Sequence, residues 1–390
     1  MKKTILALAS LAAMSPVAHA QSSVTLYGAL DTSIAYFGNQ QGTSHSGRTF
    51  EMSAGNLAPN LWGLKGTEDL GGGLAAIFKL ENGFNIDNGR LGQGEKMFGR
   101  TAMVGLTGDN VGTITLGRQY DPLIDLIQPL TNDDTFGPTF ATPGDMDNYD
   151  NSYRTNNSVK YTTPDFAGLQ ASAMYAFGGV PGSVASGQTY AAALAYNHGP
   201  FGFGAGYFHA NSDHGTAATF DGLNPDATDF AVDSVATTGA FVSANSMQII
   251  RAAGDYVFSN FTLGVSYSNV QYNDYATSFG NQNKTSFNTG QIYLNYQVTP
   301  LAIVGVGYDY TKGNGNNVTV SYNQFSFGAD YFLSKHTDIY MLAGYQKASG
   351  NTISASTGDV VSAVASMGDF GNDASNDRQA MGMVGIRHKF

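Results

Sequence analysis

The sequence predicts an all-β protein, namely a transmembrane β-barrel of about sixteen antiparallel strands. Three observations predict this fold: apolar and polar residues alternate with a period of two, short turns alternate with longer polar loops, and the chain closes on an amphipathic strand that ends in Phe390. Side chains of a strand point alternately to its two faces, so each of these strands has one apolar face and one polar face.

The first twenty residues have the pattern of an export signal. Lys2 and Lys3 form a basic start, residues 5–13 are mostly apolar, and residues 18–20 (Ala-His-Ala) resemble a cleavage site. The apolar run is too short to cross a bilayer as a helix, which needs about 20 residues. We therefore expect residues 1–20 to be removed and residues 21–390 to form a single barrel domain.

The alternation that predicts the strands is clearest in the second half of the chain. In residues 261–268, for example, Leu263 and Val265 share one face while Gly264 and Ser266 share the other. The same alternation runs through residues 24–31, 291–298, 301–310 and 324–333. A secreted β-sandwich also alternates, but it would need a second sheet to cover so many Phe and Tyr side chains.

Turns and loops alternate along the chain in the way that outer-membrane barrels require. Short turns rich in Gly, Pro, Asn and Asp fall at 69–73, 108–110, 164–166, 198–200, 259–260, 299–300 and 334–336. Longer polar stretches fall at 39–48, 86–96, 120–153, 179–186, 212–245, 274–283, 313–319 and 349–376. A barrel of this size leaves a water-filled interior, whereas about 8 strands would be filled by side chains.

The closing strand bears on where the protein resides. An open strand edge leaves backbone groups unbonded in a bilayer, so the strand that ends in Phe390 is expected to pair with the first strand. We predict that Phe390 contributes to barrel closure and to assembly. Together with the export signal, this strand indicates the outer membrane of a Gram-negative bacterium.

Composition excludes several function classes. The chain has no cysteine. Its formal net charge of −11 argues against nucleic acid as a partner. Its six histidines beyond residue 20 are scattered and form no spaced set of metal ligands, so no metal or cofactor is expected. Asp145, Asp147 and Asp150 hint at calcium, but the glycine and the terminal glutamate of an EF-hand loop are missing.

Six segments, in order along the chain, resemble the trimeric general-diffusion porins of Gram-negative outer membranes, especially their β-proteobacterial branch. They are 23–28 (SVTLYG), 62–74 (WGLKGTEDLGGGL), 98–106 (FGRTAMVGL), 116–121 (LGRQYD), 150–161 (DNSYRTNNSVKY) and 384–390 (VGIRHKF). The resemblance implies a 16-stranded barrel and a homotrimer surrounded by lipid and lipopolysaccharide. It also implies a third external loop that folds inward to narrow the pore, and residues 120–153 stand in the place of that loop.

The same resemblance suggests the residues of a pore constriction. In this family, basic side chains on the barrel wall face acidic side chains on the inward loop, and the field between them sorts ions by sign. The wall positions correspond to Leu61, Arg100 and Arg154, so two of the three basic residues match. Lys65 and Lys79 have the parity of the interior face and are predicted to replace part of the missing charge.

The acidic partners are expected in residues 120–153. We favour Asp145, Asp147 and Asp150, because they lie beside the return into the strand of Arg154. The ordinary alternative is that the arginines are hydrated at a strand end and that the aspartates belong to a solvated external loop.

Three functions are alternatives for a barrel of this kind. The first is passive diffusion of ions and small hydrophilic solutes. The second is a substrate-specific channel for a sugar or organic acid, although Tyr27 and Tyr293 form no continuous aromatic stripe on the interior face. The third is a membrane hydrolase, but nothing in the sequence orients His209 toward Ser212. We expect a passive channel and no enzyme.

Overall fold

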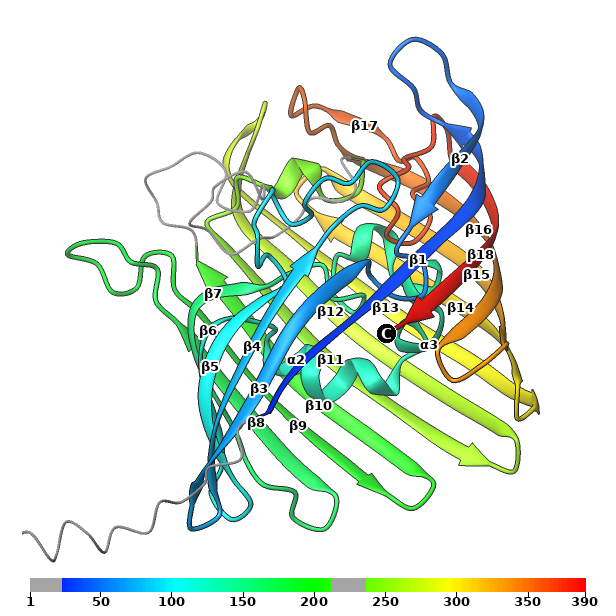
Figure 1. Ribbon diagram of the computed structural model, residues 1–390. Coiled ribbons are helices and arrows are strands. Elements are labelled where there is room, and N and C mark those ends of the chain that lie inside the picture. Colours follow the sequence, from blue (N-terminus) through cyan, green and yellow to red (C-terminus); the bar gives the residue numbers. More distant parts are fainter. Residues whose placement is uncertain (1–22, 212–235) are drawn as a thin grey trace, which may run out of the picture.

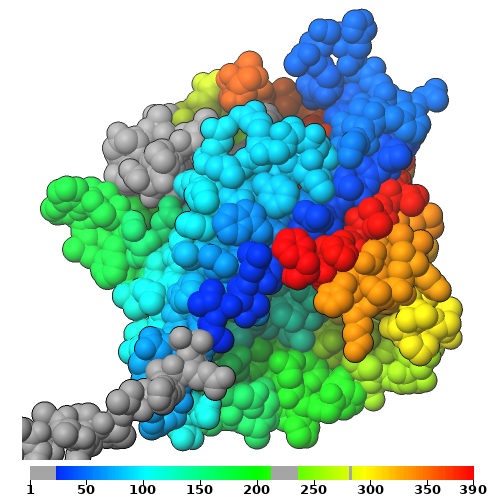
Figure 2. All heavy atoms as spheres, in the orientation of Figure 1, coloured from blue at the N-terminus to red at the C-terminus, as the bar shows by residue number. Residues whose placement is uncertain are grey.

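The computed structural model describes residues 23–211 and 236–390 (Figure 1). The predicted export signal and Ser212 lie outside these residues, as does most of the predicted loop 212–245. Eighteen strands form one sheet that closes on itself, because β1 (Ser23–Gln40) pairs antiparallel with β18 (Arg378–Lys389). Figure 2 shows the end of β18, in red, lying against the start of β1, in dark blue.

Eighteen strands make sixteen positions in the barrel, as predicted. Strands β2 (Gly47–Ala54) and β3 (Leu61–Gly71) pair with successive parts of β1 and share one position, and β17 (Val360–Ser362) pairs only with the end of β16. The other strands are β4 (Leu74–Gly83), β5 (Thr101–Gly108), β6 (Gly112–Gln119), β7 (Thr155–Thr162), β8 (Leu169–Ala176), β9 (Thr189–His198), β10 (Phe201–Asn211), β11 (Ser246–Phe258), β12 (Phe261–Thr277), β13 (Gly280–Thr299), β14 (Ala302–Gly315), β15 (Val318–Phe332) and β16 (Thr337–Ile353).

The predicted alternation of faces is confirmed. On β12, Leu263 and Val265 are 40% and 53% exposed, whereas Gly264 and Ser268 on the opposite face are buried. Among residues 23–211 and 236–390, no helix is long and apolar enough to cross a membrane. The predicted short turns all join consecutive strands.

Two predicted loops are wrong. Residues 274–283 continue the ladder of β12 and β13 as far as Thr277 and Gly280, and residues 313–319 continue β14 and β15 in the same way. These segments are polar, which is why they read as loops. A hairpin that projects into water needs no apolar face, so polar residues pair there as well as apolar ones do.

Residues 120–153, between β6 and β7, fold into short helices that pack against the small-residue face of the sheet. The helices are α2 (Pro122–Ile127), η1 (Gln128–Leu130), α3 (Asp133–Phe136), η2 (Gly137–Phe140) and η3 (Pro143–Asp145). Asp121 caps α2 by accepting a hydrogen bond from the Leu123 amide at 2.7 Å.

Glycines on the wall make room for these helices. A Cβ atom built on Gly206 would lie 2.8 Å from Cγ of Leu123, and one built on Gly328 would lie 2.3 Å from the ring of Phe136. Phe203, on the other face of β10, is 56% exposed. The helices therefore cover the face that is turned away from the exposed apolar side chains.

Candidate functional site

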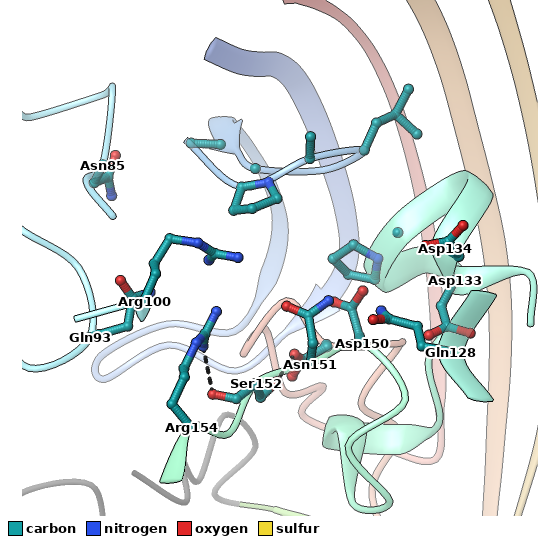
Figure 3. Close-up of a pocket in the computed structure, with 18 of the residues that line it drawn as sticks. Asn85, Gln93, Arg100, Gln128, Asp133, Asp134, Asp150, Asn151, Ser152 and Arg154 are labelled. Atoms are coloured by element: carbon teal, nitrogen blue, oxygen red, sulfur yellow. Dashed lines mark hydrogen bonds between the residues drawn. The ribbon is translucent and has the colours of Figure 1, made fainter. Parts of the chain in front are cut away.

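A cavity of about 720 Å³ lies between residues 128–154 and the connections that join β2 to β3 and β4 to β5, with Asp369 also in its lining (Figure 3). Its lining combines two guanidinium groups with carboxylates, side-chain amides and a small apolar ledge that includes Leu57 and Pro59. The charged lining residues are Arg100, Arg154, Asp133, Asp134, Asp150 and Asp369. In Figure 3 the arginines lie on one side of the view, and Asp133 and Asp134 lie on the other.

The two arginines converge on one phenol. Arg100 immediately precedes β5 and Arg154 immediately precedes β7, and their Nη2 atoms donate to the Tyr120 hydroxyl at 2.6 and 2.7 Å. The guanidinium carbon of Arg154 lies 4.8 Å from the centre of the Tyr120 ring. Tyr120 donates in turn to Asn151 at 2.9 Å, so one side chain positions both cations.

The three predicted aspartates have different surroundings. Asp150 is half-buried and lines the cavity with the two arginines, whereas Asp145 and Asp147 are buried and are not part of its lining. Asp145 accepts hydrogen bonds from the Asp150 amide at 2.9 Å and from the Ser152 hydroxyl at 2.8 Å. Asp147 accepts from Thr142 and from Ser268 on β12. These contacts fix the backbone that presents Asp150.

Arg251 on β11 was not among the predicted site residues. It is 1% exposed, its Nε donates to the Asp147 carbonyl at 2.6 Å, and its guanidinium carbon lies 4.2 Å from the centre of the Tyr149 ring. Arg251 therefore holds the backbone near Asp147 and the Tyr149 ring against β11. The parity of β11, on which Ile250 faces outward at 45% exposure, was the signal that placed Arg251 on the interior face.

Lys65 and Lys79 form a separate group that does not line this cavity. They are direct partners across β3 and β4. Lys79 pairs with Glu81 at 3.0 Å, and Glu81 also accepts from the Tyr27 hydroxyl at 2.9 Å. The Lys65 ammonium lies 5.0 Å from the centre of the Tyr27 ring. The positive charge of Lys79 is thus matched locally by a carboxylate.

Phe390 closes the barrel edge through its backbone. Its amide donates to the Gly28 carbonyl at 3.0 Å, and its terminal oxygen accepts from the Gly28 amide at 2.9 Å. A Cβ atom on Gly28 would lie 2.4 Å from Cζ of the Phe390 ring, so the ring covers this glycine.

Within the described residues, no group of three or more His, Cys, Asp or Glu side chains is arranged to hold a metal ion. His209 bonds through one ring nitrogen to Asn211 at 2.8 Å and stacks on Tyr190.

The buried carboxyl of Asp145 is expected to make the loop sensitive to pH. Burial, and then the neighbouring Asp147, raise its pKa from 3.8 to about 7. Between these two values the folded chain holds a proton that the unfolded chain has lost, so this contribution to stability is present at low pH and is lost as the pH rises through 7. Arg251 and the Ser152 hydroxyl act in the opposite direction.

We therefore expect the Asp150 and Ser152 amides to exchange hydrogen faster at pH 8 than at pH 5, after correction for the intrinsic rate. Mass-spectrometric hydrogen exchange on the folded protein measures this. The matched variant Asp145→Asn, which stays neutral, should show corrected rates that do not change with pH. Equal pH dependence in both proteins would contradict the assignment.

Three comparisons with known proteins all match this chain to proteins of the Gram-negative outer membrane. A family model described as Gram-negative porin matches residues 7–351. An outer membrane porin protein of Bordetella pertussis is 30% identical over 370 residues, covering 89% of this chain and 94% of the relative. An anion-selective porin from Comamonas acidovorans has a TM-score of 0.71 at 23% identity, covering 95% of this chain and 100% of that one. The trimer form of OmpT, an outer membrane protein of Vibrio cholerae, has a TM-score of 0.65 at 16% identity, covering 95% and 99%.

Proposed function

Since the chain belongs to the Gram-negative porin family, we propose that it lets ions and small hydrophilic solutes diffuse passively across the outer membrane. The observation that carries this proposal is a closed barrel with an apolar outer face and an interior cavity lined by charges of both signs. The chain is a channel rather than an enzyme, and we propose that it has no catalytic activity. Solutes would move down their gradients without a cofactor.

We infer that residues 120–153 are the third external loop and that they fold into the interior to narrow the pore. The contacts of Leu123 with Gly206 and of Phe136 with Gly328 support this inference, as does the buried Arg251. Irregular backbone is tolerated at membrane depth when it lines a wet interior. A loop held at several strands would keep the aperture at a fixed width.

We propose that Arg100 and Arg154 are the basic side of the constriction and that Asp150 is part of its acidic side. The arginines share Tyr120, and Asp150 lies in the same cavity lining. Asp145 and Asp147 would act through the loop backbone. Lys65 and Lys79 would form a second, weaker cationic region, because Glu81 offsets one of their charges.

We also propose that the protein is a homotrimer in contact with lipid and lipopolysaccharide, and that residues 1–20 are a removed export signal. The trimer form of OmpT from Vibrio cholerae supports the first point at the level of the fold. The many large apolar side chains exposed on the outer face of the strands support the contact with lipid.

Planar-bilayer recording of the purified trimer tests the proposed function. We expect openings in groups of three equal steps, a linear current–voltage relation and a conductance proportional to salt concentration. Conductance that saturates, or that a sugar or organic acid blocks at low concentration, would favour a substrate-specific channel. No conductance from a well-folded trimer would refute both alternatives.

A further inference from the structure

The connection between β17 and β18 has an unusual attachment to the wall. Gln324, Gln346 and Gln379 belong to β15, β16 and β18, are direct cross-strand partners and are each 0% exposed. They form a row of neutral amides across three neighbouring strands on the interior face. Amides placed in this way can both donate and accept, so they are able to bind peptide groups as another strand would.

The glutamine row holds the backbone of residues 366–368. Gln346 donates to the Ser366 carbonyl at 2.7 Å and accepts from the Ser366 amide at 2.8 Å. The Met367 amide donates to Gln379 at 2.8 Å, and the Gly368 amide donates to Gln324 at 3.1 Å. Four hydrogen bonds thus fix three consecutive residues of a connection between strands against the wall.

The same segment also binds residues 120–153. The Gly144 amide donates to the Gly368 carbonyl at 2.8 Å, and the Asp369 amide donates to the Pro138 carbonyl at 3.2 Å. Gly368 has φ +56, and a Cβ atom there would lie 2.0 Å from the Pro138 oxygen, so a larger residue would separate the two segments. Gln324 bonds the Ala141 carbonyl at 2.8 Å as well, which ties both segments to one side chain.

These attachments place the Asp369 carboxylate in the cavity lining. The Ser152 hydroxyl oxygen lies 2.6 Å from Oδ2 of Asp369 and 2.8 Å from Oδ2 of Asp145, and its single proton is shared between these two contacts. The Ser152 carbonyl accepts from Arg154 Nη1 at 2.8 Å (Figure 3). Asp369 is half-buried, and it lines the same cavity as Asp150 and Arg154. One residue, Ser152, therefore bonds an anionic and a cationic lining group.

We propose that residues 363–374 are a second constricting segment and that Asp369 is a residue that determines ion specificity. The inference rests on the proposed function, because it concerns the same aperture. The amide of Asp369 serves the packing of the two segments, and its carboxylate offsets the field of Arg154 and favours cations. Because the glutamines are neutral, salt does not screen the bonds that hold the segment in place.

The variant Asp369→Asn tests the proposal in the full-length trimer. In a salt gradient, its reversal potential should move toward anion selectivity, with a roughly two- to fivefold fall in the cation-to-anion permeability ratio. Asp359→Asn is the matched control: it makes the same change in charge on the preceding connection, between β16 and β17, at an exposed residue outside the cavity lining. Asp369→Glu should keep the wild-type ratio.

A thiol variant covers the case in which Asp369→Asn assembles poorly. The chain has no cysteine, so Asp369→Cys introduces a single thiol. A cationic methanethiosulfonate reagent added to open channels should move the reversal potential further toward anions, with each channel serving as its own reference. Asp359→Cys should not respond.

These outcomes distinguish a failure of the proposed role of Asp369 from a failure of the proposed channel function. If wild-type channels conduct but Asp369→Asn and Asp359→Asn give the same reversal potential, or if the thiol variant does not respond, the role of Asp369 is refuted and the channel function stands. If the wild-type trimer does not conduct, the proposed function itself fails.

Discussion

Replacing both Arg100 and Arg154 with glutamine is expected to turn the channel strongly toward cations. A unit charge about 7 Å from the ion path contributes about 0.6 kcal/mol in water, with opposite sign for a cation and an anion. Removing one such charge therefore changes the permeability ratio by up to about eightfold, and salt screening lowers this to roughly three- to fivefold. The double variant should exceed either single variant in a reversal-potential measurement.

A control for charge is available on the outer rim. Arg48→Gln on β2 makes the same change at an exposed residue outside the cavity lining and should leave the ratio unchanged. Tyr120→Phe keeps both arginines but removes the hydroxyl that they share, so it should broaden the current noise more than it alters the ratio. Unchanged reversal potentials in both single arginine variants would show that the constriction lies elsewhere.

Deleting Phe390 is expected to lower the yield of folded trimer by about tenfold or more, since it removes two backbone hydrogen bonds from the seam between β1 and β18. Conductance of the channels that do form should stay normal, because Phe390 is not part of the charged cavity lining. Heat-modifiable mobility on gels measures the yield, and bilayer recording measures the conductance.

Two further variants separate the ring of Phe390 from its backbone. Phe390→Tyr retains an aromatic terminus and both hydrogen bonds, so it should assemble nearly as well as the wild type. Gly28→Leu leaves the terminus intact but places a side chain where the ring lies, and it should reduce assembly. A normal yield after deletion of Phe390 would refute its role in closure.

The strands and turns were predictable because their signals are local. Alternation along a strand, and turns such as 259–260, depend on residues that are adjacent in sequence. The break between β2 and β3 was not predicted, since it depends on a distant contact: Asp31 accepts from the Leu57 and Ala58 amides at 2.6 and 2.8 Å. No neighbour-to-neighbour pattern within residues 55–60 reveals that partner.

Only part of the candidate site could likewise be predicted from the sequence. Arg100 and Arg154 were identified through the resemblance of short segments, and the structure places them on one phenol. The environments of the aspartates were not readable, because Asp145 turns inward with φ 43 and bonds Ser152, while Asp150 faces the cavity. Asp369 comes from a connection more than two hundred residues away, so only the folded chain brings it to the site.

The bare glycines under the helices have an evolutionary consequence. A larger residue at Gly206 or Gly328 would push Leu123 or Phe136 away from the wall and would be expected to shrink the opening. The charged residues of the cavity lining would all be retained. If residues 120–153 form the constriction as we propose, sieving by size and sorting by sign depend on different residues and hence on different codons. On this proposal, a single base change at either glycine would make the membrane less permeable to bulky toxic compounds and would leave the selectivity between ions unchanged.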